Sequence, residues 1–214
     1  RIMHQIRITI NTAYKVIPMP RKPRLTQLGM THHVFSRCIE KKGLLNDTFA
    51  SELLIEVLHM AQDKYAFELI AFQIMDNHFH FVIQTVEDGK TISRIMQYIK
   101  ARFAERYNRA NERCGPFWNE RFKDIVIEQS DNPMHYLLWL LWYLAFNPVR
   151  KKLTTNPRKY RYSSINCYLD EQHICPLKIT LHQYFLWLGD TFADRMKSFL
   201  YYEEAYRKRL AIMF

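Results

Sequence analysis

The sequence predicts an α+β domain of the ferredoxin-like, split βαβ type: an antiparallel sheet, a further helix after the last strand and a helical C-terminal appendage. Three observations predict it. The spacing of apolar residues switches between strand and helix periods in the order strand, helix, strand, strand, helix, strand, helix. Only Asp76 and Asn77 separate the two middle strands, which is typical of an antiparallel hairpin. At 214 residues, the chain is long enough for one domain with a substantial core.

The first half of the domain contains a strand, a helix and the hairpin. Residues 31–40 are rich in β-branched and aromatic side chains and predict the first strand. Asn46 or Asp47 can cap the next element, a helix. Its apolar residues recur at helical spacing (Leu53, Leu54, Val57 and Leu58). Residues 67–75 and 78–85 form the two strands of the hairpin.

The second half begins with a helix at about residues 91–111 and a strand at residues 124–129. Residues 176–214 read as a helical appendage, rich in Tyr and Leu, with a basic end.

The last helix of the domain is bounded by its capping and proline signals. Ser130 or Asp131 can cap its start, and Pro133 suits its first turn. We expect it to end near Asn147, because a residue that precedes a proline is driven away from helical angles and Pro148 follows.

The chain divides into three parts. Residues 1–18 differ in character from the rest of the chain and read as an N-terminal extension, since Met19 begins a basic start typical of a functional N-terminus. Residues 19–170 contain the predicted domain, and residues 171–214 the helical tail.

The charge balance suggests a polyanionic partner. Lys and Arg number 31 against 21 Asp and Glu, which gives a formal net charge of +10, and 14% of residues are aromatic. Cationic side chains gain by displacing counterions from phosphates, and aromatic rings stack on unpaired bases. The alternative is that the excess charge only keeps the protein soluble.

Composition also argues against several classes of protein. Charged and apolar fractions are near the globular norm, which argues against disorder. The longest apolar run, from Tyr136 to Phe146, is far shorter than the ~20 residues that cross a bilayer, so we expect no membrane span. The four cysteines form no Cys-x-x-Cys pair and are typical of reduced thiols in a cytoplasmic protein.

Two histidines of the hairpin are candidate metal ligands. In a strand, residues i and i+2 project from the same face, so His78 and His80 can turn their imidazoles to one ion while Phe79 and Phe81 enter the core. Histidines on the solvated face of a hairpin can equally be ordinary surface residues.

A tyrosine and an asparagine of the last helix are candidates for the same site. Tyr143 and Asn147 are four residues apart and share a helix face, and an amide oxygen can bind a hard divalent cation. The alternative is that Tyr143 packs in the core and Asn147 caps the helix.

Basic residues occur in runs that could follow a phosphate backbone or lie on a solvated surface. One run steps along a face of the helix at residues 91–111, and two others follow the helix of Tyr143. They are Arg94, Arg102, Arg106 and Arg109, then Arg150, Lys151 and Lys152, and then Arg158, Lys159 and Arg161.

The segments DNHFHFVIQ, ISRIMQYIKARFAERYNRANERCGPFWNERFKD, YLAFNPVRKKL and NPRKYRYSSINCYL, in this order and spacing, resemble the REP-associated tyrosine transposases, which are IS200-like, single-tyrosine HUH transposases. The resemblance runs from about Met19 to Leu169. The usual motif has proline where this chain has Asp76, and histidine where it has Ala145.

The resemblance implies a metal-dependent transposase that cleaves and rejoins single-stranded DNA through a 5′-phosphotyrosine. Tyr143 would be the nucleophile, and His78, His80 and Asn147 would hold Mg²⁺ or Mn²⁺. The family's substrates are REP hairpins with a short flanking tetranucleotide, bound by a monomer or a homodimer. Candidate DNA contacts are Arg21, Lys22, Arg24, Arg94, Arg102, Arg106, Arg109, Trp118, Arg121, Lys123, Arg150 and Lys151.

Two other functions compete with this interpretation. A domesticated relative could bind hairpin DNA without cutting it, although all four site residues are present. A histidine-based phosphoesterase would need a third histidine in series or a second His-x-Thr/Ser pair. Here Phe81 and Val82 follow the histidine pair, and the sequence contains no second motif.

Overall fold

The computed structural model describes residues 27–213, so the predicted extension at residues 1–18 and the candidate contacts Arg21, Lys22 and Arg24 lie outside the described residues. Four strands form one antiparallel sheet in the order β2-β3-β1-β4. This order confirms the predicted ferredoxin-like plan. The strands are β1 (Thr31–Arg37), β2 (Phe67–Ile74), β3 (His78–Thr85) and β4 (Lys123–Val126).

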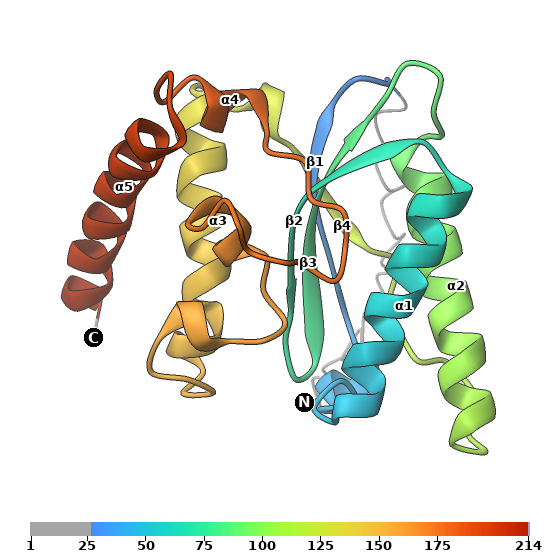
Figure 1. Ribbon diagram of the computed structural model, residues 1–214. Coiled ribbons are helices and arrows are strands. Elements are labelled where there is room, and N and C mark those ends of the chain that lie inside the picture. Colours follow the sequence, from blue (N-terminus) through green and yellow to red (C-terminus); the bar gives the residue numbers. More distant parts are fainter. Residues whose placement is uncertain (1–26, 214) are drawn as a thin grey trace, which may run out of the picture.

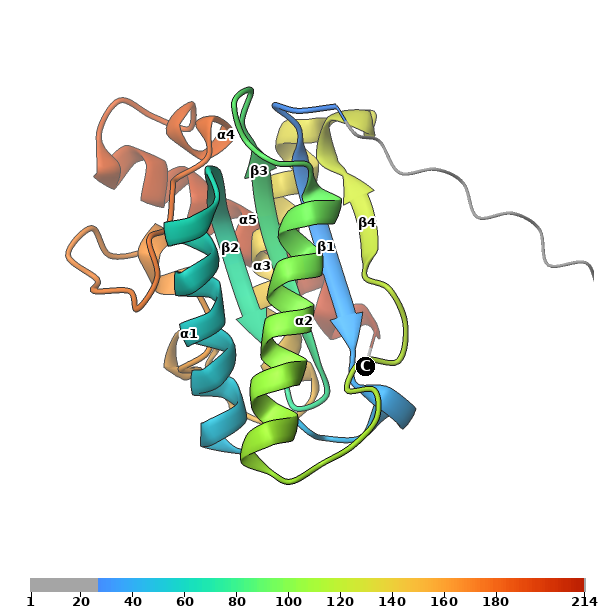
Figure 2. The same ribbon diagram turned by 90° about the vertical axis from the view of Figure 1, so that its right-hand side faces the viewer.

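Helices cover both faces of the sheet. Helices α1 (Thr48–Lys64) and α2 (Ile92–Ala110) lie on one face, and α3 (Pro133–Arg150) lies on the other (Figures 1 and 2). Phe79 and Phe81 are fully buried under α1 and α2, as the alternation of β3 predicts. The intervening residues of β3 therefore face α3.

Capping residues fix where two of these helices begin. Asp47 caps α1, as predicted, by accepting a hydrogen bond from the backbone N–H of Ala50 at 2.6 Å. The cap of α3 is Asn132, which accepts from the N–H of His135 at 3.0 Å, so the predicted caps Ser130 and Asp131 were wrong. Ser130 does not cap α3 because it closes the 3₁₀ turn that follows β4. Its N–H and its hydroxyl both donate to the carbonyl of Ile127.

Helix α3 continues past the predicted end at Asn147 and reaches Arg150. Pro148 has no N–H to donate, but the next turn still forms, with the N–H of Lys151 bonded to the carbonyl of Asn147 at 3.1 Å. Burial of Pro148 between its neighbours offsets the single missing bond.

Strands β1 and β4 are shorter than predicted because tertiary hydrogen bonds divert the chain at their ends. After Arg37, the N–H of Cys38 bonds to the carbonyl of Asn77 and that of Ile39 to the carbonyl of Phe117. The chain then enters a 3₁₀ turn with positive φ at Glu40. After Val126, residues 127–129 form a 3₁₀ turn in place of the predicted last half of the strand.

The C-terminal tail packs on the domain, with a short helix α4 (Gln183–Leu186) and a long helix α5 (Phe192–Met213). Helix α5 lies on the outer side of α3 (Figure 1). The indole of Trp142 stacks on Phe199 with centroids 4.8 Å apart, and its Nε1 donates to the Phe199 carbonyl at 3.0 Å. Helix α3 is thus held between the sheet and α5. None of the helices in the described part of the chain is long and apolar enough to cross a membrane.

Candidate active site

The two histidines of β3 are buried between the sheet and α3. Only 8% of His78 and 5% of His80 is exposed, so they are not ordinary surface residues of an open hairpin. Their rings lie 5.1 Å apart, centroid to centroid, at 82°. Helix α3 covers this face because its apolar side chains pack on Val82 and Ile70 of the sheet.

Helix α3 brings Tyr143 and Asn147 against His80. The half-buried ring of Tyr143 meets the imidazole edge to face at 6.0 Å. Asn147 is 5% exposed, and its Nδ2 lies 3.2 Å from His80 Nε2. The four residues that the sequence nominated from two distant segments therefore form one cluster, and Asn147 is no simple helix cap.

Strand β1 contributes two residues that the sequence reasoning missed. His33 Nε2 lies 3.0 Å from His80 Nδ1, and the two ring centroids are 5.2 Å apart. Arg37 pairs with His78 in the antiparallel register of β1 and β3. The local signal is the period-two pattern His33, Phe35, Arg37, which places all three on one face.

Burial keeps the histidines of the site neutral. Burial, and then the charge of Arg37, lowers the pKa of His78 to about 4. The pKa of His80 is well below its ordinary value, first through burial and then through the neighbouring His33 and His78. Both imidazoles are therefore neutral near pH 7, which is the form that binds metal ions.

The donor set fits a divalent cation bound by two imidazoles and an amide. Among residues 27–213, no group of three or more His, Cys, Asp and Glu side chains is arranged to hold a metal ion. A cation at this site would therefore use His78, His80 and the amide of Asn147. The amide turns Nδ2 to His80, so ligation requires rotation of the amide to present Oδ1.

Cationic side chains surround the cluster at the end of α3. The Arg150 guanidinium lies over the Tyr143 ring, 5.2 Å from its centroid, and also interacts with Tyr206 of α5, although the residue is exposed. Lys151 follows it and acts, with Arg37, to lower the pKa of His78 after the larger effect of burial. This positive rim could receive a phosphate.

Lys123 extends the rim along the sheet. It pairs with Phe35 in β1, and Phe35 pairs in turn with His80 in β3. The Lys123 ammonium lies 5.9 Å from the centre of the Phe35 ring.

Three other candidate DNA contacts gather in a separate groove on the opposite layer. Arg94, Trp118 and Arg121 line a groove of about 690 Å³ between α2 and residues 116–122, together with Lys100. No carboxylate of the described residues lines it. Trp118 packs edge to face on Phe79, on the face of the sheet away from the histidines.

The remaining arginines of α2 are occupied by ion pairs. Arg102 and Arg109 both bond to Glu105, at 3.0 and 2.9 Å, and Arg106 bonds to Glu56 at 2.6 Å. The predicted row of arginines therefore lies away from the histidines, because α2 packs on the opposite face of the sheet.

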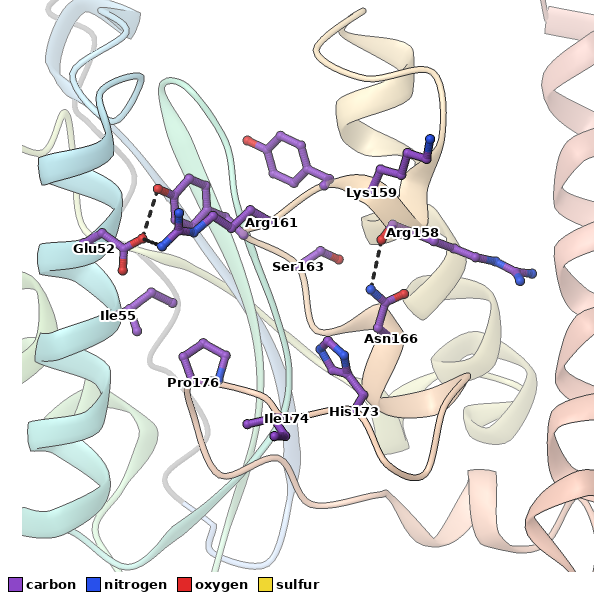
Figure 3. Close-up of a pocket in the computed structure, with 12 residues that line it drawn as sticks. Glu52, Ile55, Arg158, Lys159, Arg161, Ser163, Asn166, His173, Ile174 and Pro176 are labelled. Carbon is purple, nitrogen blue, oxygen red and sulfur yellow. Dashed lines mark hydrogen bonds and ion pairs between the residues drawn. The ribbon is translucent and has the colours of Figure 1, made fainter.

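The basic segment at residues 158–161 borders a third depression, at the edge of β2 (Figure 3). It holds about 430 Å³. Arg161 and Tyr162 both bond to Glu52 of α1, and Arg158 pairs with Glu203 of α5. Two of its cations, Arg158 and Arg161, thus tie this segment to α5 and α1.

Comparison with solved structures identifies the class of fold. The structure resembles that of the REP-associated tyrosine transposase bound to a REP hairpin, with a TM-score of 0.59 and 18% identity over 76% of this chain and 92% of that one. A crystal structure described as that of a candidate transposase from Deinococcus radiodurans R1 aligns with a TM-score of 0.39 and 16% identity, over 58% and 95% of the two chains. The first likeness gives this chain the tyrosine transposase fold.

The sequence identifies the family itself. The pattern described as "Transposase IS200 like" matches residues 26–135, more than half of the 214-residue chain, and the chain belongs to the IS200-like transposase family. The match includes His78 and His80 and ends before Tyr143. No curated protein matches the chain.

Proposed function

We propose that this transposase cleaves and rejoins single-stranded hairpin DNA through a 5′-phosphotyrosine at Tyr143. The observation that carries the proposal is the convergence of Tyr143 and Asn147, from α3, on His80 of β3. A nucleophile, polar ligands and a cationic rim then meet at one place, as phosphoryl transfer requires.

The reaction exchanges one phosphodiester for another. The phenolic oxygen of Tyr143 bonds to the scissile phosphorus, the bond from phosphorus to the 3′ oxygen breaks, and the phenolic proton passes to the departing 3′ oxygen through solvent or an acceptor. Attack by a 3′ hydroxyl on the phosphotyrosine reverses these steps and joins a strand without ATP. Arg150, over the Tyr143 ring, is placed to hold the phosphate during both steps.

His78, His80 and Asn147 would hold Mg²⁺ or Mn²⁺, which supplies charge neutralisation at the phosphate when bound. Neutral imidazoles and an amide oxygen form a mixed nitrogen and oxygen donor set, and this set favours Mn²⁺ over Mg²⁺ because Mg²⁺ prefers oxygen ligands alone.

DNA recognition would use both faces of the sheet. Arg37, Lys123, Arg150 and Lys151 surround the site on the α3 face, and Arg94, Trp118 and Arg121 line the groove of α2 on the other. The neighbouring transposase structure contains a REP hairpin. A folded hairpin presents phosphates on several sides, so different parts of it could contact both surfaces.

A covalent adduct assay tests the proposal. A single-stranded oligonucleotide with the repeated hairpins that flank the gene, labelled at its 3′ end, is incubated with the protein and Mn²⁺. We expect a labelled protein band in denaturing gels, because the downstream fragment stays bound through its 5′ phosphate. Tyr143→Phe should remove the band, and Tyr136→Phe, two turns earlier on α3, should keep it.

Two results would contradict the proposal. A band that survives Tyr143→Phe would show that another residue is the nucleophile. Tight hairpin binding by wild type without any band would favour the non-cleaving DNA-binding function.

A further inference from the structure

His33 is a buried residue of the site for which the proposed reaction has no use. It lies on β1, 5% exposed, and its ring contacts the rings of Phe35 and His80, at centroid distances of 5.4 and 5.2 Å. Its Nε2 lies 3.0 Å from His80 Nδ1, and its Nδ1 has no hydrogen-bond partner among the described residues.

His80 is therefore engaged through both ring nitrogens. Nδ1 faces His33, and Nε2 faces the amide of Asn147. A neutral imidazole carries one proton, so the hydrogen bond at one nitrogen decides whether the other keeps its lone pair. If His80 Nδ1 donates to His33, Nε2 is free to accept from Asn147 or to bind a cation. If His33 donates instead, Nε2 of His80 carries the proton and cannot be a ligand.

We propose that His33 is a positioning residue that accepts the Nδ1 proton of His80 and so holds the Nε2 lone pair of His80 toward Asn147 and Tyr143. The amide of Asn147 already presents its N–H side to Nε2, which is the orientation that a lone pair there requires. A metal-binding histidine commonly donates its second N–H to a carboxylate or a carbonyl, and here a second imidazole takes that place.

Phe35 packs against this acceptor in a tilted arrangement, with the ring planes at 35°. Phe35 contacts both imidazoles, with its ring 5.5 Å from that of His80, and so restricts the space in which either ring can turn. Phe35 therefore helps to hold the two imidazoles in the orientation of their hydrogen bond.

Two measurements test the proposal, and the first does not depend on the proposed function. Long-range ¹H–¹⁵N NMR of the metal-free protein reports the tautomer of His80, with the signal assigned by His80→Gln. We expect the Nδ1-protonated form in wild type and a shift toward the Nε2-protonated form in His33→Phe. The second measurement, which rests on the proposed function, is Mn²⁺ affinity by calorimetry. We expect His33→Phe to weaken it about 10- to 100-fold.

Two further variants separate positioning from folding. His33→Gln supplies an amide oxygen as acceptor and should restore most of the Mn²⁺ affinity. His182→Gln removes another buried histidine, one that bonds to Thr31 and not to His80, and should change neither measurement.

An Nε2-protonated His80 in wild type would overturn the proposal, even if His33→Phe did not fold. Unchanged tautomer and affinity in His33→Phe would also overturn it. If wild type shows the expected tautomer but binds no Mn²⁺, the proposed metal dependence fails while the role of His33 in fixing the tautomer stands.

Discussion

The ring of Tyr143 meets the imidazole of His80 edge to face, with centroids 6.0 Å apart and planes at 89°. The first residue belongs to α3 and the second to β3, so the contact depends on how the helix lies on the sheet. Helix α3 is clamped from outside by α5, through the stack of Trp142 on Phe199. The tail of the chain thus helps to hold the tyrosine against the histidine.

The guanidinium of Arg150 lies over Tyr143, and its loss should weaken both DNA binding and adduct formation. We expect Arg150→Gln to lower hairpin affinity about fivefold at low salt and to reduce the salt dependence by about one phosphate contact. Adduct formation should slow further, because the phosphate loses a charge beside the nucleophile.

Fluorescence anisotropy at several salt concentrations measures the first effect, and the adduct assay the second. Lys208→Gln is the control, since this exposed lysine of α5 pairs with Glu204 and neutralisation there removes the same charge. Equal losses in both variants would show that only net charge matters.

The groove beside α2 should bind DNA, while the ion-paired arginines of the same helix should not. The double variant Arg94→Gln/Arg121→Gln removes two cations of a groove that no carboxylate of the described residues lines, and we expect about tenfold weaker hairpin binding and a salt slope smaller by about two. Arg102→Gln/Arg109→Gln removes the same charge from residues bonded to Glu105 and should change affinity much less.

Anisotropy titrations of the two double variants, side by side, make this comparison. Equal weakening would mean that the helix acts through its total charge and would remove the groove from the DNA-binding surface.

Asn147 should act as a metal ligand through its amide oxygen. Asn147→Leu has a similar volume and no ligand atom, and we expect it to lose at least about tenfold in Mn²⁺ affinity. Asn147→Asp keeps an oxygen at the same place and adds a charge, so it should bind Mn²⁺ at least as tightly as wild type. Calorimetric titration measures both, and an unchanged affinity in Asn147→Leu would exclude the amide from the metal site.

Local patterns were sufficient to predict the strands and helices. The alternation around Phe79 and Phe81 and the helical spacing around Leu53 gave the correct element types in the correct order. The ends of elements were less predictable because non-local bonds decide them. Cys38 leaves β1 to bond with Asn77, and α3 passes through Pro148 because the helix is packed on both sides.

The site was predictable only where its residues lie close in sequence. The spacing of His78 with His80, and of Tyr143 with Asn147, nominated two pairs, and the fold brings them together. The contact of His33 with His80 depends on the register of β1 against β3, which no short-range pattern encodes. The pairs of Arg102 and Arg109 with Glu105 have the i,i+3 and i,i+4 spacing of a helix and are local in sequence. The pair of Arg106 with Glu56, and the position of α2 on the opposite layer, depend on the tertiary structure.

His182 should make the protein less stable in mild acid. It is buried, its Nδ1 accepts from the N–H of Tyr184 at 3.1 Å, and its Nε2 lies 3.1 Å from the hydroxyl of Thr31. Burial lowers the pKa of His182 to about 4, against a smaller opposing effect of Glu128, the charged group that acts on it. Between pH 6.5 and about 4, His182 therefore stays neutral in the folded state, whereas in the unfolded chain it takes up a proton.

Because the pKa is lower in the folded state, the stabilisation is complete above the unfolded value of about 6.5 and is lost as the pH falls toward 4. The free energy of unfolding should decrease by up to about 1.4 kcal/mol per pH unit for this histidine alone in that window. His182→Gln should be less stable than wild type by about 1 kcal/mol at pH 7.5, through weaker hydrogen bonds. At pH 4.5 the difference should vanish or reverse, because the variant has no proton to take up there. Urea denaturation at both pH values measures the two free energies, and a difference that stays constant between them would contradict the lowered pKa.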